Sequence, residues 1–426
     1  MTYDFVAHPH REEVLKEVHA RPFHPIKTPS RFLHYAFMTS AEQAADDRKA
    51  FQLFCLFNSA PPPPFWAKHH RVQIGKSTVQ WEQHTEFTTY TWELSTSNAH
   101  PFENVAGDVE TGMNKISQPG PLLVAIDLHL VAAGILTNVE ALFEHSSLAM
   151  ARVDRNSALI ATDFRVDANG VVRLLVEDRG LTPARAGALV QRLLEIETYR
   201  MLALLGWPEA QKVSPAVKII EDTLVRIARS MTETEGLSAD HALLNELTTL
   251  AATLEAESAV SGYRFGASRA YDSIVQQRLK AIGEEPIDGW PTFEAFLARR
   301  MAPAMRTCAM LEERQANLSR KLTRATNLLR TRVDVEIEQQ NRDLLASMNK
   351  RARMQLRLQQ TVEGLSVAAI SYYVVGLAGY VFKGAKESGY FPLESSIATA
   401  LVVPVALIAV AIVVARIRLL HGKHDD

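Results

Sequence analysis

The chain has 426 residues, and its 46 Lys and Arg residues nearly balance 48 Asp and Glu residues, giving a formal net charge of −2 and a pI of about 6.7. This balance excludes a basic field over the whole molecule, so the composition does not predict nucleic acid as a partner. The two cysteines, Cys55 and Cys308, are too few for a disulfide framework and are typical of a reducing compartment.

Residues 1–181 combine helix and strand patterns, which predicts a mixed cytosolic domain of the α+β or α/β class. Charged and apolar residues recur at helical spacing over 10–18, and the three prolines within 22–29 predict an extended or turning path. Residues 41–57 predict a second helix, because the four prolines at 61–64 end the helical pattern.

Strand patterns follow this helix. Residues 71–94 are rich in Val, Thr, Trp, Tyr and Phe with polar alternation, which predicts two or three half-buried strands. Residues 122–131 predict a further strand. Residues 158–166 and 171–177 predict a hairpin, because the Asn-Gly pair between them supplies the positive φ of a tight turn.

Helix patterns replace strand patterns from Thr182 and Pro183, which are typical of an N-cap and a first helical position. Helices are expected over residues 183–205, 208–231, 238–260 and 264–282, with glycines at 206, 236 and 262 near the breaks. We therefore expect a helical layer over residues 182–290.

A long stalk helix is expected over residues 291–363. The segment Asp288-Gly-Trp-Pro291 is a helix start signal, and Pro303 is expected to kink or restart the helix. No Gly or Pro follows until Gly364, and this run of 60 residues would be ~90 Å long at about 1.5 Å per residue.

Apolar residues repeat every eleven positions along the expected stalk, at Leu311, Leu322, Val333 and Leu344. An eleven-residue repeat corresponds to about 3.67 residues per turn, which keeps one apolar seam on a nearly straight helix. The seam needs a partner. Both the helices of residues 183–282 in the same subunit and a stalk shared between subunits remain open.

Two charge-free apolar stretches, residues 364–382 and 395–415, lie near the end of the chain. Each is long enough for a helix to cross a hydrocarbon core of about 30 Å. Only twelve residues separate them. We therefore expect a transmembrane hairpin within residues 364–426, followed by a basic tail.

Small residues fall near one face of the first stretch, at Gly364, Ala368, Ser371, Val375 and Gly379. Residues of this kind let helices approach closely in lipid. Packing against the second span and the lining of a pore are both open interpretations of this stripe. Neither stretch carries an ionisable residue, which argues against a proton relay.

Basic residues predict the orientation of the hairpin. Lys and Arg residues flank it at 350–357 and 416–423, whereas the connecting turn has two lysines that two glutamates partly offset. Short basic flanks stay in the cytoplasm, and the N-terminal residues lack the pattern of a secretory signal. We expect a multi-pass protein of the bacterial inner (cytoplasmic) membrane with both termini cytoplasmic and the lipid bilayer as a partner.

Motifs for catalysis or metal binding do not emerge. Several histidines lie in the first 34 residues, but their spacing matches no zinc site. No Ser-His-Asp or paired-carboxylate arrangement can be assembled from spacing. We expect no enzyme activity, no metal site and no cofactor.

Three segments carry a resemblance to a known family. They are Glu17-Val-His-Ala-Arg-Pro22, Arg264-Phe-Gly-Ala-Ser-Arg-Ala-Tyr271 and Glu363-Gly-Leu-Ser-Val-Ala-Ala-Ile-Ser-Tyr-Tyr373. Over essentially the whole chain, the sequence resembles a bacterial family of uncharacterised membrane-anchored proteins, domain of unknown function 3422. The first segment is similar to the family's hallmark, whose positions are Glu17, His19, Arg21 and Pro22. The resemblance implies membrane residence and supplies no activity.

The order of the parts also resembles CorA-type magnesium channels, which are pentamers. The shared order is a cytosolic α/β domain, a helical layer, a long stalk, two spans and a basic tail. The Gly-Met-Asn signature of those channels is absent, and the nearest counterpart is Gly379-Tyr380-Val381. This resemblance implies a shape and no ion.

Two functional classes follow from the sequence. In the first, a cytosolic domain binds a ligand or a partner, is tethered by the hairpin, and forms a homo-oligomer. In the second, the protein is a CorA-like oligomeric cation channel or transporter that lacks the signature. No motif identifies the small ligand or ion, or the number of subunits.

Overall fold

The computed structural model describes residues 8–11, 14–15, 23–96, 101–102, 113, 116–233, 236–387 and 394–421. The chain forms two compact units. The sheet unit comprises Met1–Glu233 and Asn245–Thr326, and the tail unit comprises Thr234–Leu244 and Asn327–Asp426. The four-part division expected from the sequence, with limits after residues 181, 290 and 363, stays a prediction.

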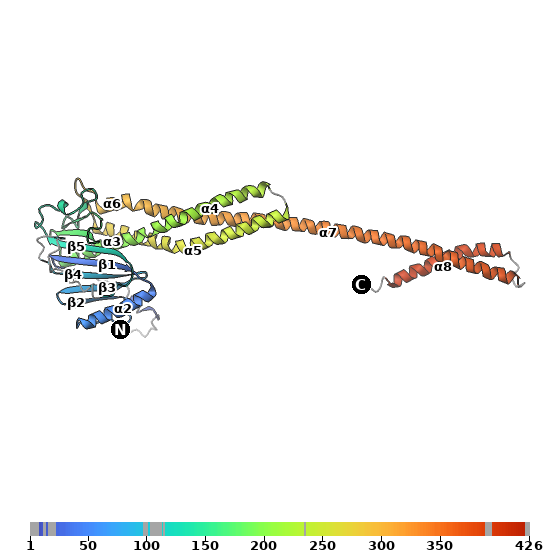
Figure 1. Cartoon of the computed structure of the whole chain (residues 1–426), viewed down its shortest axis with the longest axis horizontal. Coiled ribbons are helices and arrows are strands. Elements are labelled where there is room, and N and C mark those ends of the chain that lie inside the picture. Colours follow the sequence, from blue (N-terminus) through green and yellow to red (C-terminus); the bar gives the residue numbers. More distant parts are fainter. Residues whose placement is uncertain are drawn as a thin grey trace, which may run out of the picture. The chain divides into compact units, whose positions relative to one another are not determined.

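A mixed sheet forms the centre of the sheet unit (Figure 1). Its strands in the described part of the chain are β1 (Ser30–Met38), β2 (His69–Ile74), β3 (Ser77–Gln83), β4 (Phe87–Leu94), β5 (Leu122–Ala132), β6 (Ala149–Val153), β7 (Ala158–Thr162), β8 (Val172–Asp178) and β9 (Glu285–Pro286). Their order is β2-β3-β4-β1-β5-β8-β7-β6-β9. Neighbouring strands are antiparallel except β5 and β8, which are parallel. The predicted mixed domain is therefore confirmed.

The strands predicted within residues 71–94 and 122–131, and the hairpin of 158–177, are confirmed as β2 to β5, β7 and β8. The turn of the hairpin has Gly170 at a φ of 81°, as its Asn-Gly pair predicts. The sequence pattern does not predict β1 or β6. Strand β1 pairs with both β4 and β5 and is covered on both faces, so it lacks the alternation of a half-buried strand.

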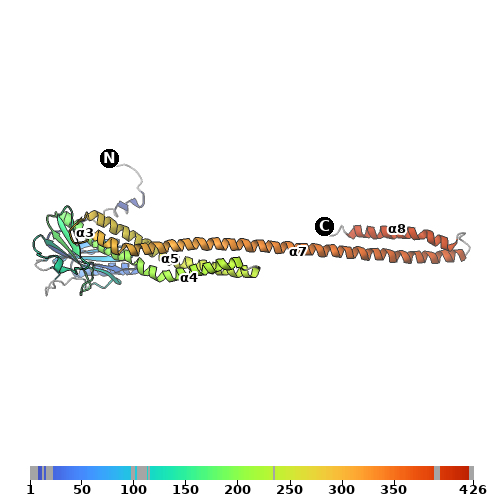
Figure 2. The ribbon, with the colours of Figure 1, turned by 90° about the horizontal axis from the view of Figure 1, so that it is seen from above.

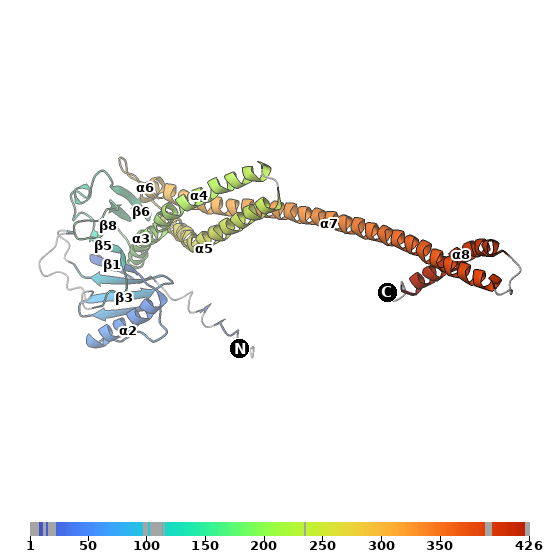
Figure 3. The same ribbon diagram turned by 45° about the vertical axis from the view of Figure 1, so that its right-hand side comes forward.

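Each face of the sheet has its own core. On one face, Phe32 and Ala36 of β1 belong to a cluster with residues of α3 (Pro183–Leu204), α5 (Leu237–Ile282) and α6 (Phe293–Arg300). On the other face, Leu33 of β1 joins Phe51 and Phe54 of α2 (Ala41–Phe57), which lies along the sheet near β3 (Figure 3). Side chains of β1 therefore alternate between two cores.

Local hydrogen bonds set the first residues of α2 and α3. The Ser40 hydroxyl accepts from the Gln43 amide at 3.2 Å, and the Gln43 side chain accepts from the Ser40 amide at 2.9 Å, forming a capping box. Thr182 caps α3, and Pro183 occupies its first turn. The helix predicted over 41–57 is confirmed, and α3 ends one residue before the predicted limit.

Helices α4 (Gly206–Glu233), α5 and the first part of α7 (Ala302–Glu387) lie side by side in the sheet unit (Figures 1 and 3). Among the contacts that join them, Arg314 of α7 donates to Glu221 of α4 at 2.7 Å, and Gln315 of α7 donates to the Ser261 hydroxyl of α5 at 3.2 Å. The prediction of separate helices over 238–260 and 264–282 is wrong, because α5 runs through Gly262. A glycine inside a helix costs only about 1 kcal/mol relative to Ala, which the packing of a long helix offsets.

Helix α7 differs from the expected stalk at both ends. The short α6 is separate, and Pro303 lies in the first turn of α7, where a missing amide hydrogen costs no helical hydrogen bond. Gly364 does not interrupt α7, so the expected stalk and the first apolar stretch form one helix. The second apolar stretch lies in α8 (Ser395–His421). Helices α7 and α8 are each long and apolar enough to cross a membrane.

The eleven-residue seam is buried along only part of α7. Leu311, Leu322 and Val333 are buried, whereas Leu344 is 60% exposed. In the sheet unit, contacts from α4 and α5 flank the seam at Leu311 and Leu322. From Ile337 onward, the apolar residues of α7 have no cover within the described chain comparable to that of Leu322.

Candidate functional site

A cavity of about 300 Å³ lies in the sheet unit, between the α3 side of the sheet and the segment that precedes β1. We name it the β1 pocket. Its lining comes from the segment before β1, from β1, β2, β3 and β4, and from α3 and α5. It includes His24, His34, Arg71, Glu82, Thr89, Thr91, Glu93, Gly187, Glu195, Thr198, Tyr199 and Arg278.

His34 of β1 is the central polar residue of the pocket wall. Its Nδ1 atom is 2.7 Å from the Thr91 hydroxyl, and its Nε2 atom is 3.1 Å from the Thr198 hydroxyl. Burial lowers the pKa of His34 to about 4, because a charged imidazole is disfavoured away from water. At neutral pH the ring is therefore uncharged and held in one orientation by two hydroxyl groups.

Thr89 of β4 supplies a hydroxyl that no described residue uses. Its side chain is 2% exposed, and its Oγ1 atom has no hydrogen-bond partner among the described residues. An unpaired buried hydroxyl costs about 1–3 kcal/mol, so a polar group of an occupant that bonds to it would recover this energy. Thr89 is therefore a candidate contact for a polar group of a ligand.

Ion pairs surround the polar centre. Arg71 of β2 donates to Glu93 of β4 at 2.5 Å across the intervening strand β3, and both side chains are only about a quarter exposed. Arg278 of α5 pairs with Glu195 of α3, which also accepts from Gln191 at 3.0 Å. These pairs place both signs of charge in the lining of the pocket.

The segment before β1 passes very close to α3. A Cβ atom at Gly187 would lie 3.0 Å from the His24 carbonyl carbon and nearer still to its oxygen. The Ile26 amide donates to the Pro183 carbonyl at 2.9 Å in the same region. Burial, followed by the charges of Arg71 and His69, lowers the pKa of His24. Glycine at 187 therefore allows this segment to form one wall of the pocket.

The segment Arg264–Tyr271, one of the three that carry the family resemblance, lies on α5. Arg264 donates to both carboxylate oxygens of Glu86, at 3.1 and 2.7 Å. Burial alone would raise the pKa of Glu86, but the hydrogen bonds from Arg264 and Tyr271 lower it below its ordinary value. Tyr271 stacks on Tyr199, with ring centroids 5.6 Å apart, and Tyr199 lines the pocket.

The candidate residues named from the sequence lie elsewhere. Glu17, His19, Arg21 and Pro22 fall outside the described residues. The seam residues Leu311, Leu322, Val333 and Leu344 do not line the pocket. Among the described residues, no group of three or more His, Cys, Asp or Glu side chains is placed to hold a metal ion.

The small-residue stripe lies in the tail unit. Ser371 is buried, and a Cβ at Gly379 would lie 3.5 Å from the Thr399 methyl group of α8. Figures 1 and 2 show α8 beside the C-terminal part of α7. Gly364 and Ala368 are exposed, so only part of the stripe faces α8.

The sequence signal that points to the pocket is the polar run in β4, where Thr88, Thr89 and Thr91 alternate with aromatic residues. Thr89 and Thr91 lie on the same face of the strand, because residues two apart share a face. Without β1 and α3 beside them, these threonines are ordinary strand residues, and the pattern alone does not indicate a site.

Comparison with known families and proteins gives one match. A family model described as "Protein of unknown function (DUF3422)" matches residues 6–421, which is nearly the whole chain. No curated protein and no solved structure matches.

Proposed function

The chain belongs to this family of proteins of unknown function, and we propose that its sheet unit is a receptor domain that binds a small polar ligand in the β1 pocket. The observation that supports this proposal is the pocket wall, which combines a neutral buried histidine, an unpaired buried hydroxyl and two ion pairs around about 300 Å³. Concave sites with a few convergent polar groups are the usual form of ligand pockets.

The charges of the wall favour a zwitterionic ligand. The lining includes two arginines and three glutamates, Arg71, Arg278, Glu82, Glu93 and Glu195. An acidic group on a ligand finds a guanidinium in either ion pair, and an amine finds a carboxylate. Because the glutamates outnumber the arginines, the wall favours a ligand whose net charge is zero or positive. We propose a molecule of the size of an amino acid or a betaine.

We propose that α7 and α8 tether the receptor domain to a membrane as a hairpin. Both helices are long and apolar enough to cross one, and the close approach of Gly379 to Thr399 is of the kind that small residues permit in lipid. The basic flanks favour cytoplasmic termini and a bacterial inner membrane. The proposal includes no enzyme activity and no nucleic acid partner.

A CorA-like oligomeric cation channel or transporter is the alternative proposal. The exposed apolar residues of α7 favour it, since Leu344 of the seam and its neighbours Ile337 and Met348 are between 39% and 60% exposed on one long helix. Exposed apolar side chains along a helix favour a partner helix, and a second copy of the chain would supply it. The same observation favours a homo-oligomer in the receptor proposal.

Thermal unfolding of the full-length protein in detergent tests ligand binding. The tryptophans at 66, 81, 92, 207 and 290 all lie in the sheet unit, so their fluorescence reports on this unit alone. We expect at least one zwitterion from a panel of amino acids and betaines to raise the unfolding temperature of the wild type. Thr89→Val should lose the shift, and Thr253→Val, on an exposed part of α5, should keep it. A panel with no effect contradicts the receptor proposal.

Topology and assembly need separate measurements. A cysteine at position 388 should react with a membrane-impermeant external reagent in intact cells, and a cytoplasm-dependent reporter fused after Asp426 should be active. The mass of the detergent-solubilised complex measures the number of subunits. A monomer would contradict both the homo-oligomer and the channel, and would leave the ligand proposal unaffected.

A further inference from the structure

A second cavity, of about 410 Å³, lies in the sheet unit away from the β1 pocket. We name it the arginine pocket. Its walls are the segments after β7 and before β6, the C-terminal part of α3, and α6, and its lining is Ser146, Ser147, Asp163, Phe164, Arg165, Arg200, Leu204, Phe296, Leu297, Arg300 and Met301. Three arginines and one aspartate give the lining an excess of positive charge.

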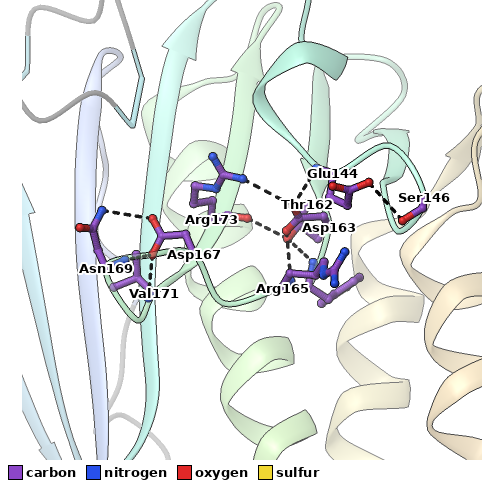
Figure 4. Close-up of polar contacts among 10 residues, drawn as sticks. Glu144, Ser146, Thr162, Asp163, Arg165, Asp167, Asn169, Val171 and Arg173 are labelled. Carbon is purple, nitrogen blue, oxygen red and sulfur yellow. Dashed lines mark hydrogen bonds and ion pairs between the residues drawn. The ribbon is translucent and has the colours of Figure 1, made fainter.

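The aspartate does not offset this charge toward the cavity. Asp163 is 1% exposed, and its carboxylate accepts from the amides of Glu144 at 3.0 Å and Arg165 at 3.1 Å. Arg173 lies 3.6 Å from the same carboxylate on the strand side. Figure 4 shows these neighbours around Asp163. The carboxylate therefore already has hydrogen-bond and ion-pair partners within the fold.

The three arginines differ in how they are held. Arg200 forms a two-point ion pair with Glu197 beside the cavity, and its guanidinium lies 5.4 Å from the centre of the Phe164 ring. Arg300 stacks on Phe296 at 4.7 Å. Within the described residues, neither Arg165 nor Arg300 has a carboxylate partner. Two unneutralised guanidinium groups therefore remain at the pocket.

Ser147 gives an independent sign of a ligand. It is 8% exposed, lines the cavity, and its hydroxyl has no hydrogen-bond partner in the described part of the chain. Phe164, next to Arg165, has a φ of 54°, a backbone conformation that is uncommon for a bulky residue. Such outliers cluster at binding sites, and this one holds the phenyl ring against Phe296 at a centroid distance of 4.9 Å.

We propose that the arginine pocket binds a phosphoryl group, with Arg165 and Arg300 as its charged contacts and the Ser147 hydroxyl as a further donor. Guanidinium groups match the oxygens of a phosphoryl group in charge and geometry. The stacked phenyl rings offer an apolar surface to the rest of such a ligand. The same chemistry is present on a soluble phosphate compound and on a phospholipid headgroup.

Calorimetric titration of the detergent-solubilised full-length protein tests this inference, with inorganic phosphate and pyrophosphate as the probes and sodium chloride at matched ionic strength as the blank. We expect saturable binding that weakens at least tenfold in Arg300→Gln and several-fold in Ser147→Ala. Arg299→Gln is the matched control. Arg299 is next to Arg300 in the sequence and is exposed, but it does not line the pocket, so this change should alter the affinity less than twofold.

A second arm uses vesicles of phosphatidylcholine with and without phosphatidic acid. Vesicle binding that needs phosphatidic acid and is lost in Arg300→Gln, but not in Arg299→Gln, would assign the phosphoryl group to a lipid headgroup. Saturation by pyrophosphate without vesicle binding would assign it to a soluble compound. Equal losses in Arg299→Gln and Arg300→Gln, or heats no larger than the sodium chloride blank in both arms, would overturn the inference.

Discussion

The close approach of α3 to the segment before β1 makes Gly187→Ala a sharp test of how the β1 pocket is built. The added Cβ would lie 3.0 Å from the His24 carbonyl carbon, and relaxed carbon contacts need about 3.5–4.0 Å. The segment must therefore move by roughly 0.5–1 Å at this carbon, and by more at the oxygen, because both partners are backbone.

Three effects set the magnitude for Gly187→Ala. Overpacking costs about 1–3 kcal/mol, and displacement of the segment weakens the hydrogen bond from Ile26 to Pro183, which contributes about 1 kcal/mol. Alanine in a helix regains about 1 kcal/mol over glycine. We therefore expect the free energy of unfolding to fall by about 1–3 kcal/mol.

Gly262→Ala in α5 is the matched control. No heavy atom lies within 4 Å of a Cβ built at Gly262, and its φ is not in the left-handed region. We expect this change to stabilise the protein by about 0.5–1 kcal/mol, because the helix gain is not opposed. Urea unfolding followed by tryptophan fluorescence measures both variants. If Gly187→Ala matched Gly262→Ala in stability, the wall beside α3 would not be held by close packing.

Three further predictions concern the seam, the buried histidine and the tail unit. Leu322→Ala should lower the free energy of unfolding by about 2–5 kcal/mol, whereas Leu344→Ala should change it by less than about 0.5 kcal/mol in the isolated chain. Urea titration measures both variants. Similar costs for the two changes would contradict the partial burial of the seam. His34 is protonated in the unfolded chain below about pH 6.5 but in the folded protein only near pH 4, so its contribution to stability is complete above pH 6.5 and falls by about 3 kcal/mol toward pH 4. His34→Gln should flatten a stability profile measured over that range, and an unchanged slope would exclude the buried neutral ring. Gly379→Leu should separate α7 from α8 in a crosslinking assay, whereas Gly364→Leu, whose Cβ has no neighbour within 4 Å, should not.

Signals that act within a few residues predicted much of the fold. The Thr182-Pro183 start of α3 and the Asn-Gly turn before β8 each act on backbone groups nearby, so the chain adopts them in any fold that permits them. β1 has no such signal. Its strand conformation depends on hydrogen bonds to β4 and β5, which the segment 30–38 does not specify by itself.

The sequence did not show whether a given glycine ends a helix or permits another segment to approach closely. Gly262 was expected to end a helix and does not, because packing along α5 outweighs its small intrinsic cost. Gly187 carried no expectation, yet it permits the approach of α3 to His24. The two glycines differ because the backbone of a distant segment lies against Gly187 and none lies against Gly262. Helix propensity describes a residue within its own helix and does not include such a contact.

The β1 pocket was beyond prediction for a related reason. His34 and Thr198 are 164 residues apart, and each is unremarkable in its own segment. Sequence resemblance identified Arg264–Tyr271 instead, and the structure shows how that segment is connected to the pocket. Arg264 holds Glu86 at the start of β4, and Tyr271 supports the Tyr199 ring that lines the cavity. Through these two contacts the segment helps to hold the wall of the β1 pocket in place.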